Sequence, residues 1–554
     1  MAAFSFDLED INGSTGFIVE DASTALSFTP FSAGVDYNDD GIDDLLITSL
    51  EEGETSQNLQ LIYGDAELPT RFDLDDLDGD NGVTITNSSP NVGINLNLSL
   101  TNLDFNGDGI QDVLTTNIEQ VAAGQPEIVS RIVFGDEDLP ATVNLGDLDG
   151  DNGTEFGGDF AIILAQSIDI NGDDADDLIL SGIDINNPNP DLPFDNFVLL
   201  GRDGNVPDSL SPSLRNGRNA FDFDLEGLPV AVGEREDVND DGIDDLAINL
   251  FDFDLETEEI SSSSSILFGS ETFPGSIDPA TFDGDGGFNL VFSDATGDEL
   301  INSNLIADTN GDEIADIFVS VTEPAAGQGE GLDFDNVGNI GDAIEAVSQR
   351  AFVVYGAETL PEDLDLTDLD GSNGFEIVNS ESESAVLRNS ETLDLNNDGL
   401  VDFFITDDES GDSYIVFGRS EEVAEIDLAD LAPRDGFALS GTESEIVGVN
   451  SGDINGDEID DLILDTISEV DYVVFGSEAS FGRELDLADE DANALEITAQ
   501  DADLIITDVI DLNDDGAGDL VYGSSFLFDS LLEEIDPAFP DVQVVYGDAD
   551  FGAS

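Results

Sequence analysis

The chain has 554 residues, of which 129 are acidic and 11 basic, and its formal net charge at pH 7 is −118. All eleven bases are arginine, and the absence of Lys, His and Cys excludes Schiff bases, Ser-His-Asp triads, thiol nucleophiles, disulfides and the common zinc ligands. The charge argues against nucleic acid and anionic membrane surfaces as partners, because phosphate binding needs clustered bases. Apolar residues still make up 40% of the chain, which predicts a folded protein with a large core.

The same composition indicates salty or marine surroundings. Self-repulsion at this charge destabilises a compact state at low salt, whereas at molar salt the screening length falls to about 3 Å. We therefore expect a halophilic protein; an acidic surface that merely aids solubility is the alternative. No transmembrane segment is expected, because no apolar run reaches 18 residues. The N-terminus lacks the basic and apolar regions of a secretory signal, so export would use another route or the chain is already processed.

A nine-residue pattern, Asp-x-Asn-x-Asp-x-x-x-Asp, occurs eight times along the chain. The copies start at Asp36, Asp104, Asp169, Asp237, Asp308, Asp394, Asp453 and Asp511. Each copy is followed by strand-like segments, the last ending in a Gly that usually follows Tyr or Phe. These glycines are Gly64, Gly135, Gly201, Gly269, Gly356, Gly418, Gly476 and Gly547. Two marks recurring together in this way identify an internal repeat.

The repeat predicts a single all-β domain over residues 1–554. The units divide at approximately 1–66, 67–137, 138–203, 204–271, 272–358, 359–420, 421–478 and 479–554. Each unit consists of short segments rich in Val, Ile, Leu and Phe that are separated by Gly, Asn and Asp turns, the pattern of β strands. A unit of this length suits one four-stranded antiparallel blade of a β-propeller. We predict eight blades, with seven blades and an appended unit as the alternative.

The repeated loop offers only hard oxygen ligands. Asp or Asn stands at positions 1, 3, 5 and 9, and position 7 can offer its backbone carbonyl. Ca²⁺ takes six to eight oxygen ligands, whereas soft metals prefer sulfur or imidazole. The loops therefore predict up to eight Ca²⁺ ions. The predicted ligands are Asp36, Asn38, Asp40, Ile42 and Asp44; Asp104, Asn106, Asp108, Ile110 and Asp112; Asp169, Asn171, Asp173, Ala175 and Asp177; Asp237, Asn239, Asp241, Ile243 and Asp245; Asp308, Asn310, Asp312, Ile314 and Asp316; Asp394, Asn396, Asp398, Leu400 and Asp402; Asp453, Asn455, Asp457, Ile459 and Asp461; and Asp511, Asn513, Asp515, Ala517 and Asp519.

Position 6 of the loop is expected to form a sharp turn. It is Gly in five copies, but Asp174, Glu313 and Glu458 occupy it in the other three, where we expect strain and weaker ion binding. An EF-hand is excluded, because it needs a bidentate Glu at position 12 and flanking helices, and position 12 is never acidic here. Asx turns that hold no ion are the alternative. The eightfold recurrence of four polar positions weighs against them.

Loops such as residues 104–112, followed by the Phe134-Gly135 step, resemble those of the FG-GAP repeat family. That family includes the N-terminal propeller of integrin α subunits and many bacterial and archaeal secreted proteins. The resemblance implies a propeller whose calcium loops join two strands of each blade on one face. In integrins the propeller has seven blades, and ligands engage the opposite face. This sequence lacks the family's Gly-Ala-Pro after the loop strand, and ligand specificity does not carry over.

These features predict a non-catalytic, extracellular calcium-binding module that recognises a surface protein or a polysaccharide. Extracellular modules bind Ca²⁺ with a Kd of about 10⁻⁴ to 10⁻³ M, so such sites would be empty in the cytosol. The alternative is a structural subunit of a surface layer, sheath or filament that self-assembles with divalent cations. A glycan-cleaving enzyme comes third: with 129 acids, a pair of carboxylates is uninformative. No catalytic residue is predicted.

Departures from the repeat are candidates for a partner site. The fifth unit carries a Gly-rich, acidic insert at approximately 323–350. Four arginines, Arg202, Arg215, Arg218 and Arg235, form an island that either accepts a ligand's carboxylate or sulfate or pairs internally. The serine run at 261–265 is interpreted as a flexible loop tip.

Overall fold

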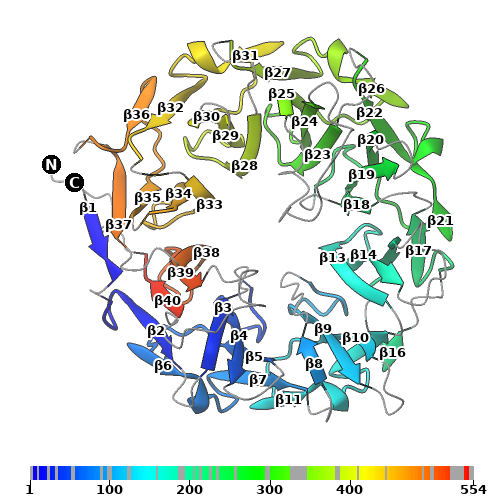
Figure 1. Cartoon of the computed structure of the whole chain (residues 1–554), viewed down its shortest axis with the longest axis vertical. Coiled ribbons are helices and arrows are strands. Elements are labelled where there is room, and N and C mark those ends of the chain that lie inside the picture. The colour runs from blue at the N-terminus through cyan, green and yellow to red at the C-terminus, as the bar shows by residue number, and fades with distance from the viewer. Residues whose placement is uncertain are drawn as a thin grey trace.

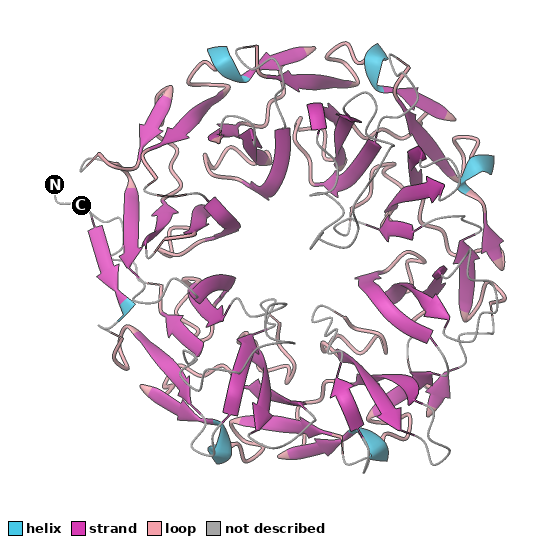
Figure 2. Cartoon of the chain, in the orientation of Figure 1, coloured by secondary structure: helices cyan, strands magenta, loops and turns pink. Residues whose placement is uncertain are grey.

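The structure is a computed structural model. It describes residues 4–8, 11–20, 25–30, 35–51, 57–87, 92–95, 103–120, 126–157, 160–184, 194–202, 204, 206–210, 215–223, 228–231, 236–254, 259–293, 300–324, 346–380, 387–407, 411–442, 444, 446–468, 470–489, 492–498, 504–524 and 542–547. Nearly all its regular elements are strands, and short 3₁₀ helices lie on the outer rim (Figure 2). In this part of the chain no helix has the length and apolar character needed to cross a bilayer.

Eight sheets stand side by side in a ring (Figure 1). The first contains β3 (Ala25–Pro30), β4 (Leu45–Glu51), β5 (Gln57–Ile62) and β7 (Gly82–Thr86), each antiparallel to the next. A fifth short strand from the following unit, β11 (Thr142–Asn144), runs parallel to β7. The predicted all-β propeller is confirmed, with eight blades rather than seven.

The next six sheets follow the same order. The second and third contain β8 (Val92–Asn95), β9 (Val113–Gln120), β10 (Pro126–Val133), β12 (Gly153–Gly157) and β16 (Ser209–Leu210), then β13 (Phe160–Ile168), β14 (Asp177–Asp184), β15 (Phe194–Leu199), β17 (Ala220–Phe223) and β21 (Ser276–Ile277). The fourth and fifth contain β18 (Leu228–Ala231), β19 (Leu246–Asp254), β20 (Glu259–Leu267), β22 (Gly287–Val291) and β26 (Asp363–Asp365), then β23 (Leu300–Ile306), β24 (Asp316–Pro324), β25 (Ala346–Val354), β27 (Gly374–Val378) and β31 (Glu425–Asp427). The sixth and seventh contain β28 (Leu387–Leu393), β29 (Asp402–Asp407), β30 (Asp412–Val416), β32 (Gly436–Ser440) and β36 (Glu484–Asp486), then β33 (Ile446–Gly452), β34 (Asp461–Thr466), β35 (Val470–Val474), β37 (Ala494–Thr498) and β1 (Phe4–Asp7).

The eighth blade closes the ring with a strand from the N-terminus. β38 (Leu504–Ile510), β39 (Asp519–Ser524) and β40 (Val542–Val545) pair in order, and β2 (Gly16–Glu20) lies antiparallel to β40, with Ile18 opposite Gln543. β6 (Arg71–Asp73) then runs parallel to β2. Because β1 pairs with β37, the N-terminal segment belongs to two blades and joins the beginning of the chain to its end. Each sheet takes its fourth strand from beyond the corresponding sequence-repeat boundary, so sheets and repeats are offset.

Short 3₁₀ helices follow five of the parallel rim strands, where the sequence repeats Leu-x-Asp-Leu or a variant. They are η2 (Leu74–Asp76), η3 (Leu145–Asp147), η4 (Pro279–Thr281), η7 (Leu366–Asp368) and η8 (Leu428–Asp430). The residue before each helix is Asp or Asn, and its side chain accepts a hydrogen bond from a backbone N–H of the first turn. This capping explains why Asp or Asn recurs at this point of the repeat.

The apolar core lies between neighbouring blades. Between the eighth and first blades, for example, Phe17 and Val19 of β2 pack with Leu45 of β4 and Val521 of β39. Burial of these side chains between sheets is a main source of stability, because each sheet alone would expose two apolar faces.

The serine run forms a strand, which corrects the expectation of a loop tip. Residues 261–265 lie within β20. Ser264 Oγ lies 2.6 Å from Ser303 Oγ of the next blade, and the Ser303 N–H donates to Asn249 Oδ1 at 2.9 Å. These contacts satisfy polar groups between the fourth and fifth blades, so small hydroxyl side chains suit this buried strand.

Candidate calcium loops

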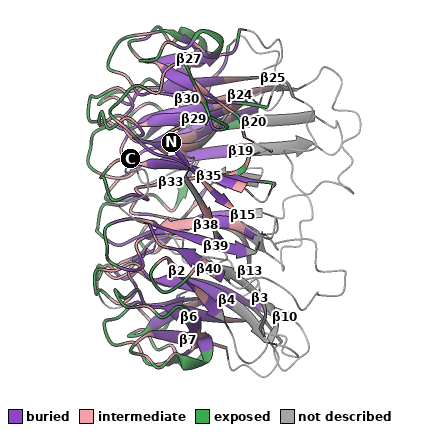
Figure 3. Cartoon of the chain, turned by 90° about the vertical axis from the view of Figure 1, so that its left-hand side faces the viewer, coloured by how far each residue is buried: buried purple, intermediate pink, exposed green. Residues whose placement is uncertain are grey.

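All forty predicted ligands lie within the described residues, on eight equivalent loops. Each nine-residue loop connects the first two strands of its sheet, as residues 36–44 connect β3 to β4. The connection from the third strand to the fourth carries the repeated Gly and lies at the same end of the sheet, because these strands alternate in direction. Figure 3 shows exposed turns gathered along one edge of the ring.

Each loop is folded by its own carboxylates. In the first loop Asp36 Oδ2 accepts a hydrogen bond from the Gly41 N–H at 2.7 Å, and Asp40 Oδ1 accepts one from the Ile42 N–H at 3.0 Å. The same two bonds, from position 6 to position 1 and from position 7 to position 5, recur in the other seven loops. Positions 1 and 5 are therefore brought together on every loop.

Two positions of each loop take a left-handed backbone conformation. Position 6 has φ of 82° to 87° where it is Gly, and 65° to 69° at Asp174, Glu313 and Glu458. Glu313 and Glu458 are thus strained, at a cost on the order of 1 kcal/mol or more, whereas Asp174 belongs to a residue type that tolerates this conformation better. Position 4, which we had not singled out, has φ of 55° to 86° in all eight loops. It is always Asp, Asn or Gly, the residue types that tolerate this conformation, so the sequence did hold that signal.

The position-9 aspartate is the most deeply buried charge of each loop. Its exposed fraction is 0% in all eight copies. In the first loop Asp44 Oδ2 accepts from the Tyr37 N–H at 2.9 Å, and Asp44 Oδ1 accepts from the Gly64 N–H at 3.0 Å. The repeated Gly donates to position 9 in every blade, at 2.7 to 3.0 Å. The nine-residue loop and the repeated Gly therefore belong to one site.

Steric crowding explains why the donor of this bond is glycine. A Cβ at Gly64 would lie 2.3 Å from the Asp43 carbonyl oxygen and 2.5 Å from Ile42 Cγ2. At all eight glycines the nearest atom would lie only 2.1 to 2.6 Å away. No side chain fits there without moving the loop.

Burial raises the pKa of every position-9 carboxyl. The pKa reaches about 8 at Asp44 and Asp245, about 7 at Asp316 and Asp461, and about 9 at Asp519. At Asp112, Asp177 and Asp402 it also lies well above the usual range. In each case desolvation outweighs the hydrogen bonds that the carboxylate accepts. A cation beside the carboxylate would oppose this shift, so the electrostatics suit a cation at these loops.

The asparagine at position 3 also fits an oxygen-ligated cation. The Oδ1 atoms of Asn239 and Asn513 are buried without a hydrogen-bond partner. In the first loop, by contrast, Asn38 Oδ1 accepts from the Asp40 N–H at 3.1 Å. Within the described residues, no three acidic side chains converge as a preformed metal cage. The oxygen donors of each loop match Ca²⁺ in kind. Because they do not yet converge, binding would require the loop carboxylates to turn inward from their present hydrogen bonds.

Neighbouring loops are hydrogen-bonded to one another around the ring. The position-2 carbonyl accepts from the residue after the repeated Gly of the next blade, as Leu512 O does from the Asp65 N–H at 3.0 Å. Six further junctions of the described chain have this bond, at 2.7 to 3.3 Å, and at the junction of blades seven and eight Asp453 O accepts from the Gly518 N–H at 2.6 Å. The position-2 side chains are buried at 0% to 1% exposure; they are Tyr37, Phe105, Ile170, Val238, Thr309, Leu395, Ile454 and Leu512. The loops therefore form a continuous circle.

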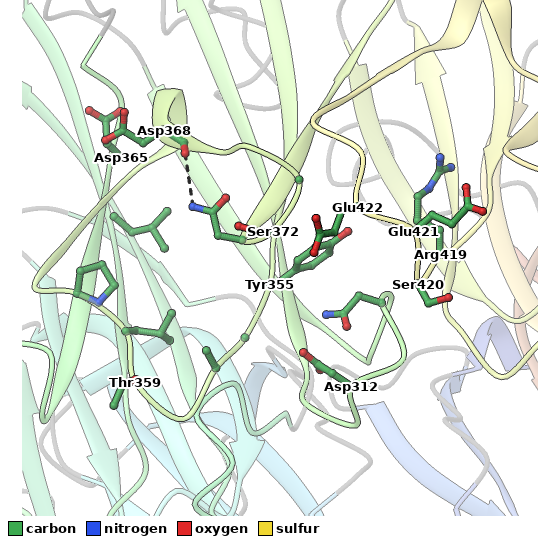
Figure 4. Close-up of a pocket in the computed structure, with 18 of the residues that line it drawn as sticks. Asp312, Tyr355, Thr359, Asp365, Asp368, Ser372, Arg419, Ser420, Glu421 and Glu422 are labelled. Carbon is green, nitrogen blue, oxygen red and sulfur yellow. Dashed lines mark hydrogen bonds between the residues drawn. The ribbon is translucent and has the colours of Figure 1, made fainter.

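The loop-bearing face is hollowed beside position 5. A cleft of about 670 Å³ adjoins the fifth loop and is lined by Asp312, Tyr355, Asp365 and Arg419, among others (Figure 4). An equivalent cleft of about 320 Å³ adjoins the first loop. Arg419 is paired with Asp435 at 3.2 Å, so its charge is already compensated.

Within the arginine island, the structure shows internal pairing for Arg215. Arg215 forms ion pairs with Asp195 and Asp222, and its guanidinium carbon lies 4.5 Å from the Phe197 ring centroid. For Arg215 the structure therefore favours internal pairing over binding of a ligand's carboxylate or sulfate. Arg235 and residues 325–345 of the predicted insert lie outside the described residues.

Comparison with known proteins shows no family for this chain. No family model matches the sequence, and no curated protein matches it, so membership of the FG-GAP family stays an expectation. A solved structure described as BBS1N in complex with ARL6DN, soaked with lead, is similar over 82% of this chain and 94% of that chain. The identity is 7% and the TM-score 0.31, which is too low to carry any argument. The chain is a β-propeller, and its further classification rests on its own residues.

Proposed function

We propose that this chain is a calcium-stabilised recognition module that acts outside the cell and binds a surface protein or a polysaccharide without catalysis. The observation that carries the proposal is the set of eight loops with the same four polar positions, each with a fully buried position-9 carboxylate. Burying an ionised carboxylate is costly unless a cation is near it. Eight such carboxylates on one face favour a chain that folds fully only where Ca²⁺ is plentiful.

The energetic effect of Ca²⁺ would be large. At ten times its Kd an ion adds about 1.4 kcal/mol per site, so eight sites add on the order of 11 kcal/mol. That matches the whole stability of a typical domain. Sixteen positive charges would still leave a net charge of about −102, starting from −118. The expected dependence on salt therefore persists in the calcium-loaded protein.

The loops of this chain would supply all the protein ligands to each ion. Positions 1, 3, 5 and 9 offer side-chain oxygens and position 7 a carbonyl, while the Gly N–H keeps the position-9 carboxylate in place. When bound, the ion would draw the carboxylates of its loop together, neutralise their charge and stiffen the loop-bearing face of the propeller. This role is structural, and it leaves recognition to surfaces built on the rigid ring.

Binding and assembly can be tested in one experiment. The purified chain is passed over immobilised neutral and acidic polysaccharides and extracellular-matrix proteins, with Ca²⁺ or with chelator, while light scattering follows its size. We expect saturable, chelator-sensitive binding to one of these probes by a monomer. Ordered assembly on adding Ca²⁺, without binding, would instead favour the structural-subunit alternative. Release of products from a polysaccharide would contradict a non-catalytic role.

A further inference from the structure

A pair of buried acids lies outside the loops, at the junction of the seventh and eighth blades. Asp465 on β34 and Asp471 on β35 are each 2% exposed. Leu464 of β34 faces Tyr472 of β35, so the two acids stand at the next position of the same antiparallel register, and each affects the pKa of the other. Two adjacent buried carboxylates repel each other, so this arrangement favours a proton on one of them.

The hydrogen bonds around the pair place that proton on Asp465. Asp471 Oδ1 accepts from the Thr466 N–H at 3.0 Å, and Asp471 Oδ2 accepts from the Tyr522 hydroxyl at 3.3 Å. Both oxygens of Asp471 are thus acceptors. Asp465 Oδ1, by contrast, is buried without a hydrogen-bond partner. Asp465 therefore has an oxygen free to carry the proton.

The contact from Tyr522 crosses between blades. Tyr522 lies on β39, in the blade that β2 closes, whereas Asp465 and Asp471 lie in the seventh blade. The pair thus joins the last complete blade to the blade shared by the two ends of the chain. Packing here is tight, since a Cβ at Gly448 of β33 would lie 3.2 Å from Asp465 Oδ2.

No arginine occurs on the strands packed around the pair. Strands β33, β34, β35, β37, β38 and β39 carry only acids and tyrosines as titratable groups. Besides the pair these are Asp461, Tyr472, Glu496, Asp508, Asp519 and Tyr522. Glu469, in the turn between β34 and β35, lies outside the described residues. With no cation on these strands, burial and the neighbouring Asp471 raise the pKa of Asp465 to about 8.

We propose that Asp465 and Asp471 form a proton-binding latch at the closing junction of the propeller. The shared proton lets two buried acids hold the seventh and eighth blades together. Loss of that proton leaves two adjacent buried charges and loosens the contact of β34 and β35 with β38 and β39. This role is independent of ion binding by the loops.

The direction of the pH effect follows from the raised pKa. A carboxyl that binds its proton more tightly in the folded chain than in the unfolded chain stabilises the fold fully below about pH 4. That contribution declines as the pH rises and is lost once the pH passes about 8. The junction is therefore weakest in alkaline solution.

Substitution at the two acids tests the latch. Asp465→Asn keeps a hydrogen donor toward Asp471 but cannot titrate, and Glu478→Gln removes one exposed charge from the same blade as a control. In saturating Ca²⁺, we expect the Tm of the wild type and the control to fall by several degrees more between pH 6 and 9 than that of Asp465→Asn. Asp471→Asn should lower the Tm at every pH, because its amide cannot accept on both sides. Equal pH slopes in wild type and Asp465→Asn, or the reverse asymmetry, would overturn the proposal.

A second measurement needs no variant. The infrared carbonyl band of a protonated carboxyl group should persist at pH 7 in the calcium-saturated wild type and disappear above about pH 9. Absence of that band at pH 7 would overturn the latch. A lower count of bound Ca²⁺ in Asp465→Asn than in the wild type would also overturn it, because a metal ion would then occupy the place of the proton.

Discussion

The backbone N–H of Asp511 donates a 3.1 Å hydrogen bond to Asp43 Oδ2, across a sequence separation of 468 residues. Asp511 is position 1 of the eighth loop and Asp43 is position 8 of the first. The contact therefore links the last loop to the first, at the junction that β2 completes. Similar bonds join Asp104 to Asp176 and Asp394 to Asp460, so a position-8 aspartate connects successive loops at three junctions of the described chain.

This contact predicts that Asp43→Ala loosens two loops at once. Without the acceptor, the Asp511 N–H is left unsatisfied, which costs about 1 to 3 kcal/mol locally. Hydrogen exchange measured peptide by peptide in Ca²⁺ should be faster in the first and eighth loops alone. Asp43→Asn is the control, because its amide oxygen still accepts the bond. Unchanged exchange in Asp43→Ala would show that the contact does not couple the loops.

Adding a methyl group should destabilise the fold by different amounts at the repeated Gly64 and at Gly41, which is position 6 of the first loop. Gly64→Ala places a Cβ against the Asp43 carbonyl and Ile42 and should destabilise the fold by about 3 kcal/mol. Gly41→Ala meets no atom within 4 Å, and only its positive φ of 87° penalises the change, by about 1 kcal/mol. Urea denaturation in Ca²⁺ measures both. Equal losses in the two variants would contradict the crowding seen at Gly64.

In the three loops with an acid at position 6, replacing that acid by glycine should strengthen Ca²⁺ binding. Glu458→Gly removes the strain of a non-Gly residue at a φ of 65°. We expect tighter Ca²⁺ binding at the seventh loop and a Tm increase that appears only with the ion. Glu458→Gln removes the same charge but keeps the strained backbone, and should show no such gain. Weaker Ca²⁺ binding by Glu458→Gly than by Glu458→Gln would mean that backbone strain at position 6 does not limit the affinity of this loop.

Closure of the ring by the N-terminal strand β2 can be tested with an engineered disulfide. The sequence has no cysteine, and Ile18 faces Gln543 across the antiparallel pair of β2 and β40. Facing antiparallel residues lie within disulfide reach, so Ile18→Cys with Gln543→Cys should oxidise to a cross-linked monomer. Reduction should lower its Tm, since the bond constrains a very long loop in the unfolded chain. Intermolecular dimers instead of the internal bond would contradict closure by β2 of the same chain.

Local spacing was enough to predict the blades and the loop positions. The Asp-x-Asn-x-Asp pattern and the short apolar runs are local features, and a unit that recurs eight times reveals its boundaries in one sequence. The preference for glycine at position 6 was visible for the same reason. The left-handed conformation at position 4 was missed, because Asp39, Gly107 and Asn397 do not look alike until their backbone angles are compared.

Contacts between distant residues could not be predicted. Gly64 and Asp44 were recognised as separate marks, but only the folded sheet brings the Gly64 N–H to the buried carboxylate. Ser264 was expected in a flexible loop tip because it lies in a run of serines, whereas its hydroxyl is satisfied by Ser303 from the next blade. The pairing of Arg215 with Asp195 likewise depends on tertiary packing, which no spacing rule encodes.

The central claim is that Ca²⁺ stabilises the eight loops, and a thermal melt paired with a count of bound ions tests it most directly. The melt is recorded with and without chelator, at low and high NaCl, and bound calcium is counted on the same sample. The account predicts about eight ions per chain and a large fall in Tm on chelation, greatest at low NaCl, where self-repulsion is least screened. No bound calcium together with an unchanged melt would contradict it, and the loops would then be turns alone.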